Sequence, residues 1–512
     1  MHPHYEEQEP FQIRREKLEA IQKLSIDPYP HSFSPTHSLD RVAGWPDPLG
    51  DSEEGANRRG PHCRLAGRLT LFRAMGKNAF AHIQEGGISF QLLFNREVTQ
   101  VQGLPEGEKP LKFIEKSLDL GDVIGVEGYL FTTHRGEITL FVHELTLLAK
   151  ALLPLPDKHS GLQDKGTRYR KRWLDLISHP ETLDKFRLRS RMVQAIRHYL
   201  EDSQFLEVET PILQSLYGGA EAKPFETTLE ALKQSMYLRI SLEIPLKKLM
   251  VGGIPRLFEM GKVFRNEGID ATHNPEFSLL EAYAAYWDYR EVLRFVEGLF
   301  AHVAKTLTGS TTLMVRKDEE SEPLAIDLSP PWKSMTMLEA IAEYGSLSVE
   351  GKSDRQLIGH LEGTKHEGKE MPRGLLIAAL FETYAEPHLI QPHHILDHPI
   401  ETTPLCKPHR NPEKKEEGLV ERFESFILGR EMCNAYSELN DPLLQRDLLT
   451  QQQKKKEAGE EEAHPLDEEF LEALAQGMPP VGGFGIGIDR MAMLFCDLLS
   501  IRDVLYFPWM KE

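Results

Sequence analysis

Charged and aromatic side chains suited to binding a nucleotide are concentrated in the stretch from Arg256 to Tyr283. The planar guanidinium of Arg265 can hold a phosphate or a carboxylate through paired hydrogen bonds. His273 adds a donor of adjustable charge, and Phe277 offers a flat apolar face to a base. Charged groups that are costly to bury unpaired stand in or beside the apolar runs, namely Arg265, Glu267, Glu276 and Glu281. The stretch predicts a nucleotide-binding cleft; an amphipathic hairpin with salt-bridged surface charges is the alternative.

A second polar set lies in the segment RFESFILGREMCNAYSELNDP, where carboxylates could bind a metal. Glu424 and Glu431 are seven residues apart on an expected strand. Odd spacing puts two side chains on opposite faces of a regular strand, so a shared metal site requires a bulge or a turn near Gly429. Further polar groups alternate along the continuing strand, namely Asn434, Tyr436 and Glu438.

The run from Gly482 to Gly487 predicts a glycine-rich loop through which the backbone can approach a ligand closely. The residues IDRMAMLF that follow predict a helix, whose N-terminal amides favour anions. Asp489 and Arg490 stand at the start of this helix, and Arg490 can meet a phosphate. The alternative is a capped helix without a ligand.

Regular elements must position these side chains. Alternation predicts strands over Leu257–Phe264 and from Phe277 onward, joined by a polar loop. Near-helical spacing of apolar residues predicts a helix over Thr182–Leu200, and residues 287–308 also read as helical. The run QFLEVETPIL predicts a strand stopped by Pro211, which belongs at a sheet edge or a subunit boundary because proline cannot pair inside a sheet. Of the two places, the subunit boundary is favoured. Residues 315–400 predict a mixed insertion.

The N-terminal third has a different pattern. Residues 10–23 have the spacing of a short amphipathic helix, with Ile13, Leu18 and Ile21 on one side, and residues 44–62 read as a flexible connector. Residues 63–150 contain short β-like runs with a helical interruption near 110–117, which predicts a five-stranded oligonucleotide-binding (OB) barrel. On its strands Phe80 and Gln91 could present an aromatic platform and an amide to unstacked bases, with Arg73 and Glu137 nearby. The alternative makes Phe80 a core residue of a barrel that binds protein.

Two further segments are rich in charge. Residues 154–173 begin with prolines and end in a basic cluster from Lys165 to Arg172, which predicts a domain linker. This cluster could guide a phosphate backbone or could simply be solvated. The segment near 451–464 reads as charged and solvated, with no assigned function.

Bulk properties limit the class of protein. The 512 residues exceed one core and predict two or three domains. The formal net charge of -19 argues against nonspecific nucleic-acid binding by the whole surface. No apolar run is long enough to span a membrane, and the N-terminus lacks a signal peptide, so a cytoplasmic location is expected. The four cysteines are too far apart for a disulfide framework or a zinc site.

The quoted motifs resemble those of the bacterial-type class II lysyl-tRNA synthetases over nearly the whole chain. FLEVETPIL is similar to the first class II motif, FRNEGIDATHNPEF to the second and GGFGIGIDRMAML to the third; LRISLE and NAYSELND are specific to the lysyl branch. The resemblance implies an α+β fold with an OB-fold anticodon-binding domain at 63–150, a linker at 151–180 and a class II catalytic domain at 181–512 built on an antiparallel sheet. It also implies a homodimer whose interface the first motif supports, tRNA(Lys) as partner, and ATP and L-lysine as substrates.

The resemblance also implies a role for each matching residue. Arg265 and Arg490 are the expected catalytic residues, and ATP binding is expected from Arg265, Glu267, His273, Phe277, Glu424 and Arg490. Mg²⁺ is expected at Glu424 and Glu431. Lysine binding is expected from Glu243, Arg265, Glu281, Asn434, Tyr436 and Glu438, and anticodon binding from Arg73, Phe80, Gln91 and Glu137.

The residue types agree with lysine as the amino acid. Glu243, Glu281 and Glu438 concentrate negative charge that suits an ammonium group, whereas a pocket for aspartate should carry Arg or Lys. Three alternatives stay open: a class II ligase for aspartate or asparagine, an enzyme that attaches lysine to a translation factor, and a noncatalytic nucleic-acid-binding protein with this fold. The acidic pocket contradicts a ligase for aspartate or asparagine. Enzymes that attach lysine to a translation factor lack the anticodon barrel that is expected here. An intact set of Arg265, Arg490 and their partners argues against a noncatalytic protein.

Overall fold

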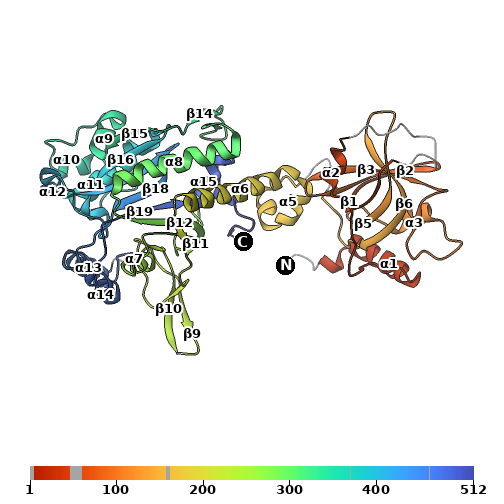
Figure 1. Cartoon of the computed structure of the whole chain (residues 1–512), viewed down its shortest axis with the longest axis horizontal. Coiled ribbons are helices and arrows are strands. Elements are labelled where there is room, and N and C mark those ends of the chain that lie inside the picture. The colour runs from red at the N-terminus through yellow and green to blue at the C-terminus, as the bar shows by residue number, and fades with distance from the viewer. Residues whose placement is uncertain (1–4, 47–59, 157–161, 370, 460–461, 512) are drawn as a thin grey trace. The chain divides into compact units, whose positions relative to one another are not determined.

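The computed structural model describes residues 5–46, 60–156, 162–369, 371–459 and 462–511 and divides the chain into two compact units (Figure 1). Unit 1 is Met1–Asp184 and unit 2 is Lys185–Glu512. Most of the predicted connector at 44–62 and parts of the segments at 154–173 and 451–464 lie outside the described residues. None of the helices in the described ranges combines the length and apolarity that crossing a membrane requires.

Unit 1 contains the predicted barrel. Its sheet has the order β3-β2-β1-β5-β6-β4, and β3 also pairs with β6, which closes it. Inward residues such as Leu65, Ile83, Leu92 and Val142 alternate with outward ones along the strands and form the barrel core. The strands are β1 His62–Met75, β2 Asn78–Glu85, β3 Ile88–Asn95, β4 Gln100–Val101, β5 Val123–Thr132 and β6 Ile138–Ala149. The helical interruption is α3, Pro110–Ser117.

Helices precede and follow this barrel. They are η1 Tyr5–Glu7, α1 Glu9–Lys23, α2 Leu39–Ala43, α4 Lys165–Arg170 and α5 Arg172–Ser178. The prediction for α1 is confirmed in extent, but its buried residues are Phe11 and Ile21, while Ile13 is 48% exposed. The apolar face is therefore rotated from the predicted one, because Phe11 replaces Ile13 at the contact.

The basic cluster from Lys165 to Arg172 is helical in α4 and α5, which corrects the expectation of a plain linker. Arg168 Nε lies 2.6 Å from Asp175 Oδ1 and Arg172 Nη1 lies 2.7 Å from Asp175 Oδ2. Arg172 is only 2% exposed. Asp175 thus neutralises two of these cations internally, which leaves fewer of them to guide a phosphate backbone.

Unit 2 is built on an eight-stranded sheet with the order β15-β16-β17-β18-β19-β12-β11-β7. Its central strands pair antiparallel, as predicted for a class II catalytic sheet. The strands of this sheet are β7 Leu206–Glu207, β11 Arg256–Phe264, β12 Glu276–Ala285, β15 Lys333–Thr336, β16 His393–Pro399, β17 Leu419–Ile427, β18 Arg430–Ser437 and β19 Val481–Gly487.

Smaller elements complete unit 2. A three-stranded sheet of order β8-β10-β9 contains β8 Leu213–Gln214, β9 Glu226–Leu229 and β10 Gln234–Leu238, and β13 Thr312–Val315 pairs with β14 Leu324–Asp327. The helices are α7 Glu243–Val251, α8 Tyr289–Thr308, α9 Met337–Gly345, α10 Asp354–Gly359, α11 Arg373–Tyr384, α12 Pro412–Glu416, α13 Pro442–Glu457, α14 Glu468–Ala475 and α15 Ile488–Phe495, with the 3-10 turns η2 Glu386–His388, η3 Ile400–Thr402 and η4 Ile501–Asp503. Helix α6, Pro180–Asp202, crosses the boundary between the units.

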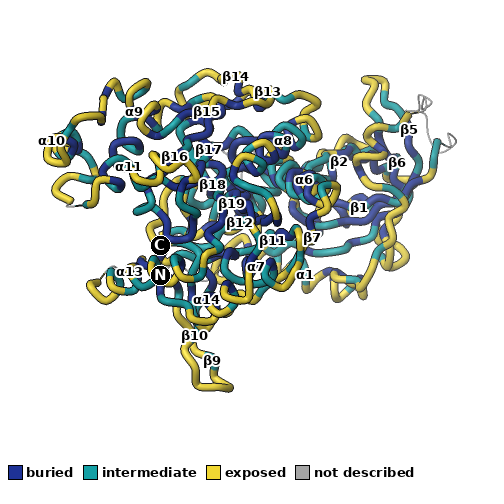
Figure 2. Tube along the Cα trace, turned by 60° about the vertical axis from the view of Figure 1, so that its left-hand side comes forward, coloured by how far each residue is buried: buried dark blue, intermediate teal, exposed yellow. Residues whose placement is uncertain are grey.

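Strand alternation gives the large sheet one apolar face and one polar face. On β12, Leu280 and Ala282 join the core formed with α6, α8 and α15, whereas Glu281 and Tyr283 face the other way. Figure 2 shows these central strands as buried. Because successive side chains on a strand alternate, carboxylates within apolar strands can all line one cavity. The predicted hairpin of Leu257–Phe264 and the strand from Phe277 is confirmed by the pairing of β11, Arg256–Phe264, with β12.

Two predicted features differ in detail. The strand before Pro211 is short, and β7 lies at the sheet edge beside β11, as the proline rule requires. The predicted insertion at 315–400 is only partly an insertion, because β15 and β16 within it extend the main sheet.

Candidate functional site

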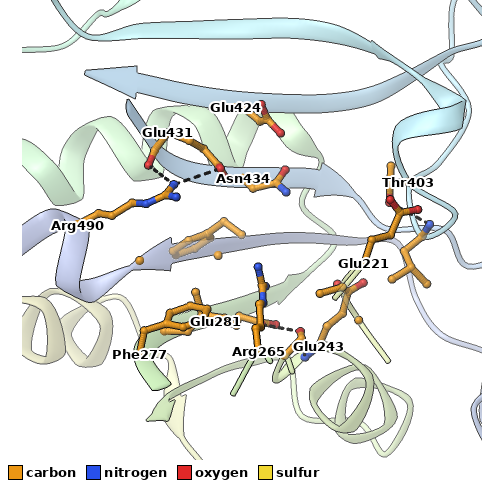
Figure 3. Close-up of a pocket in the computed structure, with 18 of the residues that line it drawn as sticks. Glu221, Glu243, Arg265, Phe277, Glu281, Thr403, Glu424, Glu431, Asn434 and Arg490 are labelled. Atoms are coloured by element: carbon orange, nitrogen blue, oxygen red, sulfur yellow. Dashed lines mark hydrogen bonds and ion pairs between the residues drawn. The ribbon is translucent and has the colours of Figure 1, made fainter. Parts of the chain in front are cut away.

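A cavity of about 400 Å³ lies on the polar face of the large sheet. All the residues of unit 2 predicted to form a site line it: Glu243, Arg265, Glu267, His273, Phe277, Glu281, Glu424, Glu431, Asn434, Tyr436, Glu438 and Arg490. In Figure 3, Glu424, Glu431 and Asn434 point into the cavity from one side, and Phe277 and Arg265 line the opposite side. The fold therefore brings together residues separated by nearly half of the chain.

Arg265 and Phe277 stand at the two ends of the loop that joins β11 to β12. The Arg265 guanidinium carbon lies 5.2 Å from the centroid of the Phe277 ring. Its Nε donates a hydrogen bond to the Ile240 carbonyl at 3.3 Å, and no ion pair joins it to a carboxylate of the described residues. A guanidinium without a fixed anionic partner, beside an open aromatic face, suits a phosphate and a base.

His273 and Arg490 meet at the same side of the cavity. Arg490 Nη2 lies 3.2 Å from His273 Nε2, and His273 Nδ1 lies 2.8 Å from Asp270 Oδ2. Although its slight burial opposes the change, hydrogen bonds from Thr272 and His273 hold the pKa of Asp270 well below its usual range. Asp270 is therefore a fixed anion that orients the imidazole ring toward Arg490.

Asp489, the neighbour of Arg490, has a structural position. It is 2% exposed and accepts hydrogen bonds from Arg189 Nη2 at 2.5 Å and from the Ser278 amide at 2.8 Å. These contacts tie the start of α15 to α6 and β12. Arg490, the next residue, is thereby held at the cavity.

Glu424 and Glu431 lie on two strands of a hairpin rather than on one strand, which corrects the expectation. Leu428 and Gly429 form the turn with φ values of 56° and 66°, and the register shifts between Ser425 and Phe426. The predicted need for a bulge or a turn near Gly429 is thus confirmed, and both are present. Together they put both glutamates on the cavity side despite their odd spacing.

Each of these glutamates has a cationic neighbour. Glu424 Oε1 lies 2.5 Å from Arg422 Nη2, and Glu431 Oε2 lies 3.4 Å from Arg490 Nη1. Among the described residues, no group of three or more His, Cys, Asp or Glu side chains has an arrangement suited to a metal ion. The pair supplies two hard oxygen ligands, which fits Mg²⁺ because this ion is usually held by one or two carboxylates together with substrate phosphates.

The glycine-rich run at 482–487 is a strand in the middle of the sheet and not the predicted loop. Phe484 and Ile486 pack into the apolar core, while Gly483, Gly485 and Gly487 lie toward the cavity. A Cβ atom at Gly483 would collide with Glu438 and with the ring of Tyr283. The glycines therefore make room for a ligand beside the strand.

Three buried carboxylates form the other end of the cavity. Glu243, Glu281 and Glu438 are 3%, 5% and 1% exposed. Glu281 accepts hydrogen bonds from Ser241 Oγ at 2.8 Å, the Leu242 amide at 2.9 Å and the Tyr283 hydroxyl at 2.9 Å. Neither oxygen of Glu438 accepts a hydrogen bond of good geometry from the described residues, and its ion-pair partner is Lys247.

Burial gives these carboxylates unusual acidities. It raises the pKa of Glu281 to about 7, and the Glu243 carboxylate adds to the rise while the three hydrogen bonds oppose it. It also raises the pKa of Glu438 to about 8, against the opposing charge of Lys247. A cationic group of a ligand would pair with these carboxylates and stabilise their ionised forms.

Several cavity residues were missed by the sequence reasoning. Tyr283 had a usable signal, because it stands two residues after Glu281 and so shares its face of the strand. Arg422 had a similar signal two residues before Glu424. Others, among them Ser241, Thr403 and His464, come from loops and gave no periodic signal.

The residues predicted to contact bases lie together on the outside of the barrel in unit 1. Arg73 pairs with Phe80 across β1 and β2, and Gln91 on β3 pairs with Thr139 on β6. The Thr139 hydroxyl lies 3.3 Å from Gln91 Oε1 and 3.2 Å from the Glu137 carbonyl oxygen. Phe80 is half-buried and absent from the apolar core, which disfavours the alternative that it is a core residue.

Comparisons with known proteins agree with both units. The chain matches the family of tRNA synthetases class II (D, K and N) over residues 164–511 and the OB-fold nucleic acid binding domain over residues 63–148. It is similar to the lysine–tRNA ligase of Chlamydia pneumoniae, with 54% identity over 99% of this chain and 98% of the relative. The lysine–tRNA ligase of Thermoanaerobacter sp. (strain X514) is 45% identical over 98% of this chain and 95% of the relative. That of Listeria innocua is 42% identical over 98% of this chain and 97% of the relative.

Proposed function

Because this chain belongs to the class II tRNA synthetases and is a lysine–tRNA ligase, we propose that the cavity of unit 2 binds ATP and L-lysine and that the barrel of unit 1 binds the anticodon of tRNA(Lys). The observation that carries this assignment is the composition of the cavity. A free guanidinium beside an open aromatic ring occupies one part, and three buried carboxylates occupy another. The first suits a nucleotide and the second suits the ammonium group of lysine.

In the nucleotide part, Phe277 stacks on adenine and Arg265 bridges the α-phosphate and the lysine carboxylate. His273, Arg490 and Glu267 lie along the path of the outer phosphates, and all three line the cavity. Arg490 leaves Glu431 for a phosphate when ATP binds, since their ion pair is long at 3.4 Å, partly exposed and therefore weak. Arg265 and Arg490 compensate the negative charge of the ATP phosphates, which the carboxylates of the cavity would otherwise repel.

Glu424 and Glu431 are the residues that would hold Mg²⁺, together with phosphate oxygens of ATP. The ion, when bound, compensates the negative charge on the phosphates. The two glutamates supply only oxygen ligands from opposite strands of one hairpin, which keeps their separation nearly fixed.

The reaction needs no side-chain nucleophile. A carboxylate oxygen of lysine attacks the α-phosphorus, the bond to the bridging oxygen breaks, and pyrophosphate leaves with that electron pair. A ribose hydroxyl at the 3′ end of tRNA then attacks the carbonyl carbon of lysyl-adenylate, loses its proton and displaces AMP. Arg265 aligns the two reactants and stabilises charge that develops at the α-phosphate.

Lysine selection rests on the acidic end of the cavity. Glu243, Glu281 and Glu438 surround the position of the ammonium group, and Asn434 and Tyr436 lie beside the aliphatic chain. Asn434 Nδ2 donates to the Tyr436 hydroxyl at 3.2 Å, and Arg422 Nε donates to Asn434 Oδ1 at 3.0 Å, so these side chains are held in place. Aspartate would place its negatively charged side-chain carboxylate against three buried carboxylates, which would repel it.

The direct test is lysine-dependent exchange of pyrophosphate into ATP without tRNA, compared with aspartate and asparagine. Exchange with lysine alone supports the proposal. Exchange with aspartate or asparagine would assign the site to another branch of the same family, and ATP binding without any exchange would indicate a noncatalytic protein.

The anticodon proposal predicts the effect of replacing Phe80 with alanine. The stacking of one base on an aromatic ring contributes about 1 to 3 kcal/mol, so kcat/KM for tRNA charging is expected to fall by roughly 5- to 150-fold. Lysine-dependent pyrophosphate exchange is expected to stay unchanged. Aminoacylation and exchange assays on the same preparation measure both. Met75→Ala, at the exposed end of the same hairpin, is the matched control, and equal charging by both variants would contradict the proposal.

A homodimer is proposed through the edge around Pro211. Leu206, Ile212 and Leu213 are 53%, 42% and 44% exposed there, which is a large apolar exposure beside a short edge strand. Leu213→Glu is expected to convert a dimer into a monomer in sedimentation velocity at micromolar concentration, whereas Met314→Glu on the exposed face of β13 is not. A monomeric unmodified protein would overturn this proposal without affecting the others.

The cytoplasm, where tRNA, ATP and lysine occur together, is the proposed location.

A further inference from the structure

Lys247 is a fully buried cation at the acidic end of the cavity. It lies on α7, one turn after Glu243, and its side chain has 0% exposure. Its ammonium forms ion pairs with Glu243 Oε1 and with Glu438 Oε2. Lys247 does not line the cavity itself, so it contacts the two carboxylates from behind.

The two ion pairs join separate elements of unit 2. Glu243 begins α7, and Glu438 directly follows β18. Although burial opposes the change, these carboxylates hold the pKa of Lys247 above its ordinary value, so it is a cation. A buried cation is costly unless it is paired, so Lys247 favours the ionised forms of both carboxylates.

We propose that Lys247 is a positioning residue for amino-acid selection: a built-in counter-cation that orients Glu243 and Glu438 and favours their ionised forms, so that the cavity selects a side chain with a positive charge. This inference rests on the proposed lysine site. One internal ammonium balances one of the two carboxylates, and the ammonium of the substrate balances the other.

The physical reason is the behaviour of adjacent buried carboxylates. Without a cation between them, two such groups cannot both be ionised near neutral pH. They share one proton instead. A site in that state carries one negative charge fewer and discriminates less against a neutral side chain. With Lys247 present, a neutral side chain leaves a buried carboxylate without a partner, and the site rejects it.

Other charged or titratable groups face this cluster and must be considered in any pH dependence. They are Glu281 and Tyr283 on β12, Tyr436 on β18, Arg422 on β17, Cys406 and His464. Burial lowers the pKa of His464 to about 4, and burial raises the pKa values of Tyr283, Tyr436 and Cys406. These four are therefore neutral between pH 6 and 9, and Arg422 stays charged. In this cluster, Glu281 and Glu438 titrate within that range.

The test compares Lys247→Met with Lys248→Met in pyrophosphate exchange between pH 6 and 9. Lys248 is the next residue on α7, and its ion pair with Glu469 is at the surface. For Lys247→Met, the KM for lysine at pH 7 is expected to rise by about 30- to 5,000-fold, as for loss of one partner of a buried charge pair. The kcat and the dissociation constant of ATP are expected to change little.

Two further readouts separate this role from a merely structural one. Since the charge of Lys247 favours ionised carboxylates, the fall of kcat/KM for lysine toward acid is expected to begin at a higher pH in Lys247→Met. The preference for lysine over 6-hydroxynorleucine, in which a hydroxyl replaces the ammonium, is expected to decrease. An unchanged pH profile together with an unchanged preference would overturn the proposal.

A double variant keeps the proposal testable if Lys247→Met folds poorly. Lys247→Met with Glu243→Gln removes a cation and an anion together, so it is expected to unfold at a higher temperature than Lys247→Met alone. Failure of the second substitution to restore stability would also overturn the proposal. Absence of lysine-dependent exchange in the unmodified protein would instead refute the proposed function, so the two failures are distinguishable.

Discussion

Replacing Arg265 with alanine is expected to reduce lysine-dependent pyrophosphate exchange by about 100- to 1,000-fold, as for loss of one donor that stabilises developing charge. Arg265 stands at the end of β11 with its guanidinium over Phe277 and without a carboxylate partner among the described residues. It is the group of the cavity best placed to bridge the two reacting molecules. The decrease is expected mainly in kcat, because the charge at the α-phosphate grows during the reaction.

Lysine at position 265 is expected to recover only part of this activity. An ammonium group cannot form the planar paired hydrogen bonds of a guanidinium. Lys262→Ala is the matched control, because Lys262 lies on the same strand and forms a half-exposed ion pair with Glu276 at 3.4 Å. Exchange by Arg265→Ala at the rate of this control would contradict the role of Arg265. Thermal unfolding of each variant checks that the fold is retained.

Replacing Glu438 with glutamine is expected to raise the KM for lysine by about 30- to 5,000-fold, since removing one partner of a buried charge pair costs roughly 2 to 5 kcal/mol. Glu438 is 1% exposed and has no hydrogen-bond donor of good geometry among the described residues. Its cationic partner is Lys247, which Glu438 shares with Glu243, so the two carboxylates together keep one negative charge for the ammonium group of a ligand. Glutamine keeps the size of the side chain, so the change isolates the charge.

The pH dependence gives a second measurement of the same site. A carboxylate attracts an ammonium group only when ionised, so the KM for lysine is expected to rise as the pH falls through about 8 and about 7, the pKa values of Glu438 and Glu281. In Glu438→Gln the change near pH 8 is expected to disappear. Glu469→Gln on the exposed face of α14 is the control. A KM for lysine that is equal in the two variants would show that the ammonium binds elsewhere.

The sequence by itself determined the chemistry of the site and most of the elements that carry it. Alternation placed Arg265 and Phe277 at the ends of two strands, and the barrel, the helix at 287–308 and the edge position near Pro211 also followed from local patterns. These features depend on contacts between residues close in the chain. Strand period, helix period and the missing amide of proline act locally, and the sequence displays them directly.

The errors have a common physical cause. The glycine run at 482–487 has local freedom that suits a loop, yet it pairs with β12 and β18 because those strands leave room for a strand without side chains on one face. Strands β15 and β16 belonged to a segment read as an insertion, since pairing with β17 depends on residues far along the chain. Long-range pairing overrides local preference in such cases.

Only the tertiary structure decided which charges meet. The turn at Gly429 and the register shift beside Ser425 put Glu424 and Glu431 on one face, although their spacing predicts opposite faces. The ion pairs of Lys247 with both Glu243 and Glu438 had no complete signal in the sequence, because Glu438 follows β18 and is far from Glu243 and Lys247 in the chain. Residue types fix which interactions are favourable, whereas the packing of distant segments fixes which of them form.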